Sequence, residues 1–223
     1  HVGLGQATPW ALTSARLGEA YREGRTTPEA FVERLYAQYE RLAQRQPLLS
    51  CLWTRDEQGA RAAARASGER LRAGQARGPL EGVPVVVKEQ VAVKGLTRRL
   101  GHELPGPSPM TKDAALVARL REAGAIVVGQ TAMTELGMSP IGINPKRPPL
   151  RNPHHLERAA GGSSTGTGVA VALGLTPVGV GADGGGSIRI PAAICGVYGL
   201  KPSFARVPRS GDAFAGSVNH DGP

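Results

Sequence analysis

Three consecutive glycines precede a serine in the stretch 178-VGVGADGGGSIRIPA-192. Glycine loses more backbone entropy on folding than any other residue, so such a run is costly unless bare backbone is needed there. Successive backbone N–H groups can converge on one anion. If Ser187 attacks a carbonyl group, the amides of residues 184–187 are placed to hold the resulting oxyanion. The alternative interpretation is a tight turn between a strand and a helix that only needs positive φ angles.

A second glycine-rich stretch, 161-GGSSTGTG-168, carries two adjacent serines. A phosphate-binding loop is one interpretation, but this stretch lacks the Gly-Lys-Ser/Thr ending of the P-loop, and a GxGxxG pattern that follows a strand is also absent from it. A tight turn is another. The pair of small hydroxyl side chains also suits a proton relay between a nucleophile and a base.

The base that such a relay needs is predicted to be Lys88 rather than a histidine. The nucleophile elbow GxSxG is absent, because Arg189 stands where its last glycine would be. Lys88 ends the apolar run 83-VPVVVK-88, and ligands of parallel sheets gather at the carboxyl ends of strands. Desolvation at such a place lowers the pKa of a lysine toward the range of a general base. The alternative is a surface lysine that buries only its aliphatic stem.

The elements expected to position these residues alternate between helices and strands, which predicts an α/β fold. Its core would be a mixed, mostly parallel β-sheet flanked by α-helices. Thr27 and Thr111 are predicted to cap two of the helices, and the Pro/Asn/Gly-rich residues 137–165 are predicted to be a long loop. The expected helices are 28–45, 57–74, 112–124, 166–175 and 188–196, and the expected strands are 49–53, 83–88, 125–131, 176–182 and 197–201.

Composition excludes several classes of protein. The 223 residues carry a net charge of +9, but the arginines are spread along helical stretches such as 60–77 and aromatics make up only 4%, which argues against nucleic acid as a partner. Cys51 and Cys195 form no CxxC pattern, so neither a disulfide framework nor a metal site is predicted, and no cofactor is expected. No signal peptide or membrane-spanning run is recognised, so a reducing, cytoplasmic setting is expected.

Together, VPVVVKE, GGSSTGTG and GADGGGSIRIPAAICGVYGLKPS resemble the signature of the amidase signature family, serine hydrolases that use a Ser–Ser–Lys triad. The spacings are also similar, with 75 residues from Lys88 to Ser163 and 24 from Ser163 to Ser187. The resemblance covers most of residues 15–223 and is densest at 159–203.

The resemblance implies a role for each residue that matches the motif. Ser187 would be the acylated nucleophile, and Ser163, in a cis peptide, would relay its proton to Lys88. The remaining roles fall to loop residues: the oxyanion-hole amides would come from Gly184, Gly185, Gly186 and Ser187, and the supporting residues would be Ser164, Asp183 and Arg189. The segment 132-AMTELGMS-139 resembles a loop that lines the acyl pocket in that family.

Three departures from the family pattern stand out. Gly184 occupies a position where members more often carry a larger residue, and Ala160 replaces a frequent proline. Members are also about twice as long, so residues 1–223 are expected to form the N-terminal portion of a single amidase-signature domain.

Three functions remain open at this point. The first is a serine amidohydrolase that cleaves a small-molecule carboxylic amide to an acid and an amine or ammonia. The second is the amidase-like component of a glutamine-dependent tRNA amidotransferase, and the third is an inactive fragment. A membrane partner is not expected, and the oligomeric state is open, with a homodimer as one option.

Overall fold

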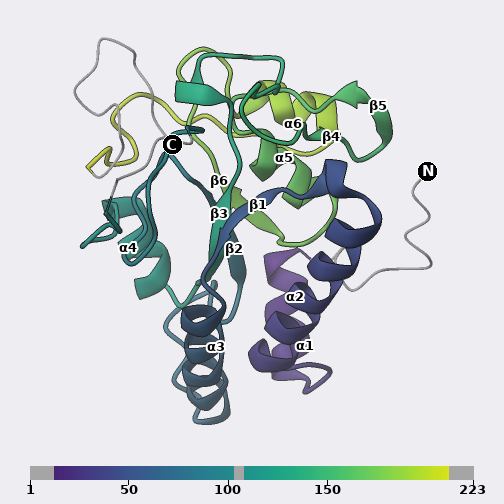
Figure 1. Cartoon of the computed structure of the whole chain (residues 1–223). Coiled ribbons are helices and arrows are strands. Elements are labelled where there is room, and N and C mark those ends of the chain that lie inside the picture. Colours follow the sequence, from purple (N-terminus) through teal and green to yellow (C-terminus); the bar gives the residue numbers. More distant parts are fainter. Residues whose placement is uncertain (1–12, 103–107, 211–223) are drawn as a thin grey trace.

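A four-stranded sheet lies at the centre of the molecule (Figure 1). The computed structural model describes residues 13–102 and 108–210. The strand order is β1-β3-β2-β6, with β1 at Leu52–Arg55, β2 at Pro84–Lys88, β3 at Ile126–Thr131 and β6 at Val178–Val180. Strand β2 pairs in parallel with β3 and β6, whereas β1 is antiparallel to β3. The predicted mixed, mostly parallel sheet is therefore confirmed.

Helices cover this sheet on both faces, with α1 and α2 on one side and α4 on the other (Figure 1). The helices are α1 (Ser14–Arg22), α2 (Pro28–Arg45), α3 (Glu57–Arg72), α4 (Ala115–Glu122), α5 (Thr165–Ala172) and α6 (Arg189–Cys195). Two short 3-10 turns, η2 (Pro47–Leu49) and η3 (Glu135–Gly137), and a small ladder of β4 (Arg151–Asn152) with β5 (His155–Ala159) complete the elements.

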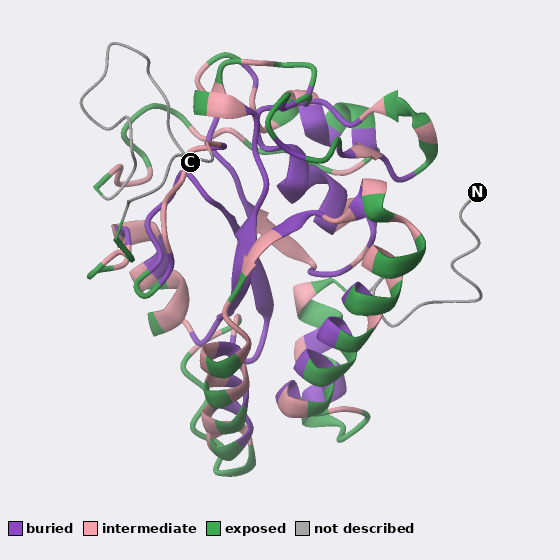
Figure 2. Ribbon diagram, in the orientation of Figure 1, coloured by how far each residue is buried: buried purple, intermediate pink, exposed green. Residues whose placement is uncertain are grey.

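The core consists of two apolar clusters separated by the sheet. Because side chains alternate along a strand, Val86 of β2 packs with α1, α2, α3 and α5, whereas Val85 and Val87 pack with α4 and residues 91–96. Both β2 and β3 are buried along their whole length (Figure 2). Short apolar strands covered on both faces are typical of parallel sheets, as the run VPVVV predicts.

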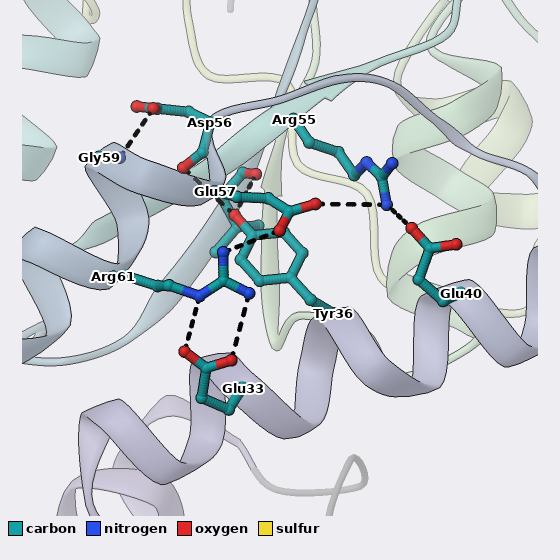
Figure 3. Close-up of polar contacts among 9 residues, drawn as sticks. Glu33, Tyr36, Glu40, Arg55, Asp56, Glu57, Gly59 and Arg61 are labelled. Carbon is teal, nitrogen blue, oxygen red and sulfur yellow. Dashed lines mark hydrogen bonds and ion pairs between the residues drawn. The ribbon is translucent and has the colours of Figure 1, made fainter.

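Helix α2 begins where its sequence predicts. Thr27 caps it by accepting a hydrogen bond from the Ala30 amide, and Pro28 occupies its first turn. Tyr36 of this helix contacts both α3 and the sheet: the Arg61 guanidinium lies over its ring, and its hydroxyl donates to the Val128 carbonyl of β3 over 2.8 Å. Figure 3 shows the Arg61 guanidinium of α3 beside the Tyr36 ring, where it pairs with Glu33 of α2.

Two predicted boundaries are wrong. The helix expected at 112–124 begins only at Ala115, because Asp113 accepts a hydrogen bond from the Lys94 amide and the Ala114 amide donates to Ala92. Thr111 is therefore not its cap. The strand expected at 49–53 begins at Leu52, because Pro47 starts the 3-10 turn η2 immediately before it.

Two further predictions differ from the structure. Residues 137–165 are not one long loop, because β4 and β5 lie within them. Residues 197–201 form no strand, and Tyr198 and Leu200 are strongly exposed. A strand needs a hydrogen-bonded neighbour, and the sheet of the described residues offers none there. The polar end expected after residue 210 lies outside the described residues.

None of the helices described is both long and apolar enough to cross a bilayer.

Candidate active site

Lys88 and Ser163 meet at the carboxyl end of β2. The distance from Lys88 Nζ to Ser163 Oγ is 2.7 Å, and both side chains are almost fully buried. The carbonyl of Ala182, just beyond β6, accepts a second hydrogen bond from Lys88 Nζ at 3.4 Å. The Gly162–Ser163 peptide bond is cis, as the resemblance implies. A buried amine thus faces a hydroxyl group at the edge where parallel strands end.

Ser164 connects this pair to the glycine triplet. Its backbone amide donates to the carbonyl of Ser187 over 3.1 Å, so the two glycine-rich stretches lie side by side. Its hydroxyl donates to the carbonyl of Ala182 and accepts from the Ala182 amide, each at 3.3 Å. The structure thereby gathers Lys88, Ser163, Ser164 and the backbone of Ser187 at one place.

The two serines directly precede helix α5, and Ser164 is its N-cap residue. The helix is buried from Thr165 to Ala170 and carries no charged residue. Gly166 lets it lie directly on the sheet, because a Cβ at this position would approach the Cys51 carbonyl oxygen to 2.6 Å and the Ala132 amide nitrogen to 2.7 Å. The small residues of this helix therefore fix how deeply Ser163 and Ser164 sit.

The glycine triplet is shaped by Asp183. Its carboxylate accepts hydrogen bonds from the Gly186, Ile188 and Arg189 amides at 2.7, 3.1 and 3.2 Å, and from the Arg189 guanidinium at 2.9 Å. Burial alone would raise the pKa of Asp183, but the guanidinium and the three amides together hold this pKa well below its usual range. The ionised carboxylate thus organises the turn that presents Ser187.

The glycines of the triplet differ in exposure. Gly184 is half-buried, Gly185 is exposed and Gly186 is buried, while Ser187 is half-buried. A Cβ at Gly185 would meet no atom within 4 Å, so open space adjoins the backbone at this point. Gly186 has a φ of +124°, which favours glycine. The turn requires glycine at Gly186, whereas Gly185 leaves room for a ligand.

An apolar groove of about 450 Å³ runs along the outer edge of β6 and reaches the site at Ser164 and Ile188. Tyr198 and Leu200, two strongly exposed apolar side chains, are among the residues that line it. Among the described residues, no group of three histidine, cysteine or acidic side chains lies close enough together to hold a metal ion.

The sequence did not reveal a buried ion pair that involves Glu89, the residue after Lys88. The carboxylate of Glu89 faces the guanidinium of Arg147, with N–O distances of 2.5 and 3.1 Å, and neither side chain is more than 2% exposed. The partners are 58 residues apart in the chain and share no periodic pattern. The one available signal is the charged residue that follows Lys88 at the end of an apolar strand, where an unpaired charge would be costly.

Comparisons with known proteins identify the relatives of this chain. The family model described as Amidase matches residues 33–223. The A subunit of the glutamyl-tRNA(Gln) amidotransferase of Halorhodospira halophila is 41% identical over 212 residues, which are 95% of this chain and 43% of that protein. The chain thus spans less than half the length of the curated relatives it matches.

Solved structures of amidases are also similar to this chain. A crystal structure of an amidase has a TM-score of 0.81 and 42% identity, covering 90% of this chain and 45% of that one. The native peptide amidase from Stenotrophomonas maltophilia has a TM-score of 0.84 and 31% identity, covering 92% and 43%. With a family model matched over most of its length and these neighbours, the chain belongs to the amidase signature family.

Proposed function

We propose that the protein is a serine amidohydrolase that cleaves a carboxylic amide through an acyl-enzyme on Ser187. The observation that supports this most directly is the 2.7 Å contact between Lys88 Nζ and Ser163 Oγ, beside the backbone of Ser187. A buried amine is more easily held neutral, as a general base must be. The wider α/β scaffold brings these groups together at one strand edge.

In the proposed acylation, Ser187 Oγ attacks the amide carbon while its proton passes to Ser163 Oγ. Ser163 gives its own proton to the neutral amine of Lys88. The tetrahedral intermediate then collapses, the C–N bond breaks, and the leaving amine takes the proton back through the same relay. Water repeats the sequence on the ester, and the carboxylic acid is released.

The oxyanion of this intermediate would be held by backbone amides of residues 184–187. The Gly186 amide donates to Asp183, so a contact from Gly186 to the oxyanion would be shared with that carboxylate. Gly185 borders open space and gives the substrate carbonyl access to the main chain. Asp183 and Arg189 would support catalysis by holding this turn, and Ser164 by joining it to the relay.

A second candidate function is supported by the names of the relatives. Several are A subunits of glutamyl-tRNA(Gln) amidotransferases, so the same relay would release ammonia from glutamine within a larger assembly. Co-purification with partner subunits or tRNA, and amide cleavage only in their presence, would favour this candidate. Hydrolysis of amides by the protein alone would favour the first.

The experiment that tests the relay is labelling of the full-length protein with a fluorophosphonate, followed by peptide mapping. We expect one adduct, on Ser187, whose rate of formation falls by at least about 10³-fold in Lys88→Met and Ser163→Ala. Ser203→Ala, which removes an exposed hydroxyl outside the site, is the matched control and should label normally. An adduct on another serine, or none, would contradict the proposal and favour an inactive protein.

A further inference from the structure

The end of strand β2 is held by the side chain that follows Lys88. Lys88 points to Ser163, whereas the adjacent Glu89 carboxylate accepts hydrogen bonds from the Arg147 guanidinium and, at 2.8 Å, from the Gly101 amide. The Glu89 amide in turn donates to the Thr131 carbonyl over 3.2 Å. Both the side chain and the backbone amide of Glu89 thus hold the chain directly after the candidate base.

Arg147 is enclosed as closely as Glu89. Its guanidinium carbon lies 3.9 Å from the centre of the Trp53 ring, within the range of a cation–π contact. One of its nitrogens also donates to the His102 carbonyl over 3.3 Å. The planar guanidinium fits a carboxylate with two parallel hydrogen bonds, a geometry that lysine cannot reproduce.

The segment that carries Arg147 also touches the other half of the relay. At Gly142, a Cβ would come within 2.3 Å of the Gly161 carbonyl oxygen, and the Gly162 amide donates to the Pro140 carbonyl over 2.8 Å. Asn144 ties the middle of the segment to the carbonyls of Gly101 and Met133, at 2.7 and 3.1 Å. Residues 140–147, the bracing segment, therefore connect the backbone before Ser163 to the backbone after Lys88.

We propose that the Glu89–Arg147 pair is a positioning device that sets the distance between Lys88 and Ser163. It acts through the bracing segment and not by contact with substrate. This inference rests on the proposed function, because it gives the pair a role only if Lys88 and Ser163 relay a proton. A displacement of about 1 Å between reacting groups can lower the rate about 100-fold. Contacts that fix the positions of Lys88 and Ser163 can therefore have a large effect on the rate.

The test measures fluorophosphonate labelling of Ser187 in the full-length protein as a function of probe concentration. Arg147→Met and the double variant Arg147→Met/Glu89→Gln are compared with the wild type. We expect the maximal labelling rate to fall by about 100-fold in both. The half-saturating probe concentration should change less than about threefold, because neither residue touches the probe.

The double variant separates positioning from folding. Replacing both charges of a buried pair is often neutral for stability, whereas removing one partner is strongly destabilising. We therefore expect the double variant to melt close to the wild type and still label slowly. Arg147→Lys, which keeps the charge but not the paired geometry, should recover less than about a tenth of the lost rate.

The matched control is Arg61→Met/Glu33→Gln, which removes an exposed ion pair between α2 and α3. It should label at the wild-type rate. Wild-type labelling by the double variant, with Lys88→Met inactive, would overturn the positioning role and leave the proposed function intact. Absence of a Ser187 adduct on the wild type would overturn both.

Discussion

The ion pairs among α2, β1 and α3 and those beside the candidate site use the same kinds of side chain, but their carboxylates differ in their access to water. In Figure 3, Arg61 spans Glu33 and Glu57, and Arg55 reaches Glu40. All five side chains are between 34 and 56% exposed. Water and salt screen such pairs, and each contributes about 0–1 kcal/mol.

Around the site the carboxylates are fully buried. Asp183 and Glu89 are 0% exposed, and each is surrounded by an arginine and backbone amides. Arg147 is as buried as Glu89, so removing either one leaves an unpaired charge in the interior and costs about 3–5 kcal/mol, whereas Arg189 is 54% exposed beside the buried Asp183. We therefore expect substitutions in the surface network to have small effects, and substitutions of the two buried carboxylates to disturb the geometry of the site.

The largest effect should follow from Asp183→Ala, which leaves three amides and a guanidinium without their acceptor. We expect the free energy of unfolding of the full-length protein, measured by urea denaturation, to fall by about 3 kcal/mol, because three backbone amides lose their acceptor. Asp183→Asn, which keeps the shape, should lose less. A variant as stable as the wild type would show that the turn at the glycine triplet holds itself.

A smaller effect should appear on acidification. The pKa of Asp183 is lowered by folding, so its contribution to stability is complete above the unfolded pKa of about 4 and is lost as the pH falls further. The urea midpoint should therefore decline below about pH 4. In Asp183→Asn this decline should be shallower, and an identical slope in both proteins would contradict the assignment.

The smallest effect should follow from Arg61→Met on the surface of α3. The change removes the pairs with Glu33 and Glu57, and we expect a loss of less than about 1 kcal/mol at low salt. Urea denaturation in 1 M NaCl should reduce the difference from the wild type further, because the Debye length is then only about 3 Å. A loss as large as that of Asp183→Ala would remove the contrast between the two regions.

Much of the fold could be predicted because its signals are local. The run VPVVV predicts β2, Thr27 predicts the start of α2, and the two glycine-rich stretches mark the turns that meet beside Lys88. Arg147 could not be assigned from sequence, because its partner lies 58 residues away. Thr111 misled for a related reason, since the competing contact of Asp113 is made with the distant Lys94 amide.

The close seating of α5 on the sheet has a consequence for sequence tolerance. At Gly166 even a single methyl group would collide with main-chain atoms of Cys51, which directly precedes β1, and of Ala132, which directly follows β3. A substitution at Gly166 would shift the whole helix. The outer face of α3, in contrast, is exposed to solvent, and we expect it to accept nearly any polar residue. Under random mutagenesis, the protein should therefore diversify at its periphery long before a single change is accepted in the first turn of α5.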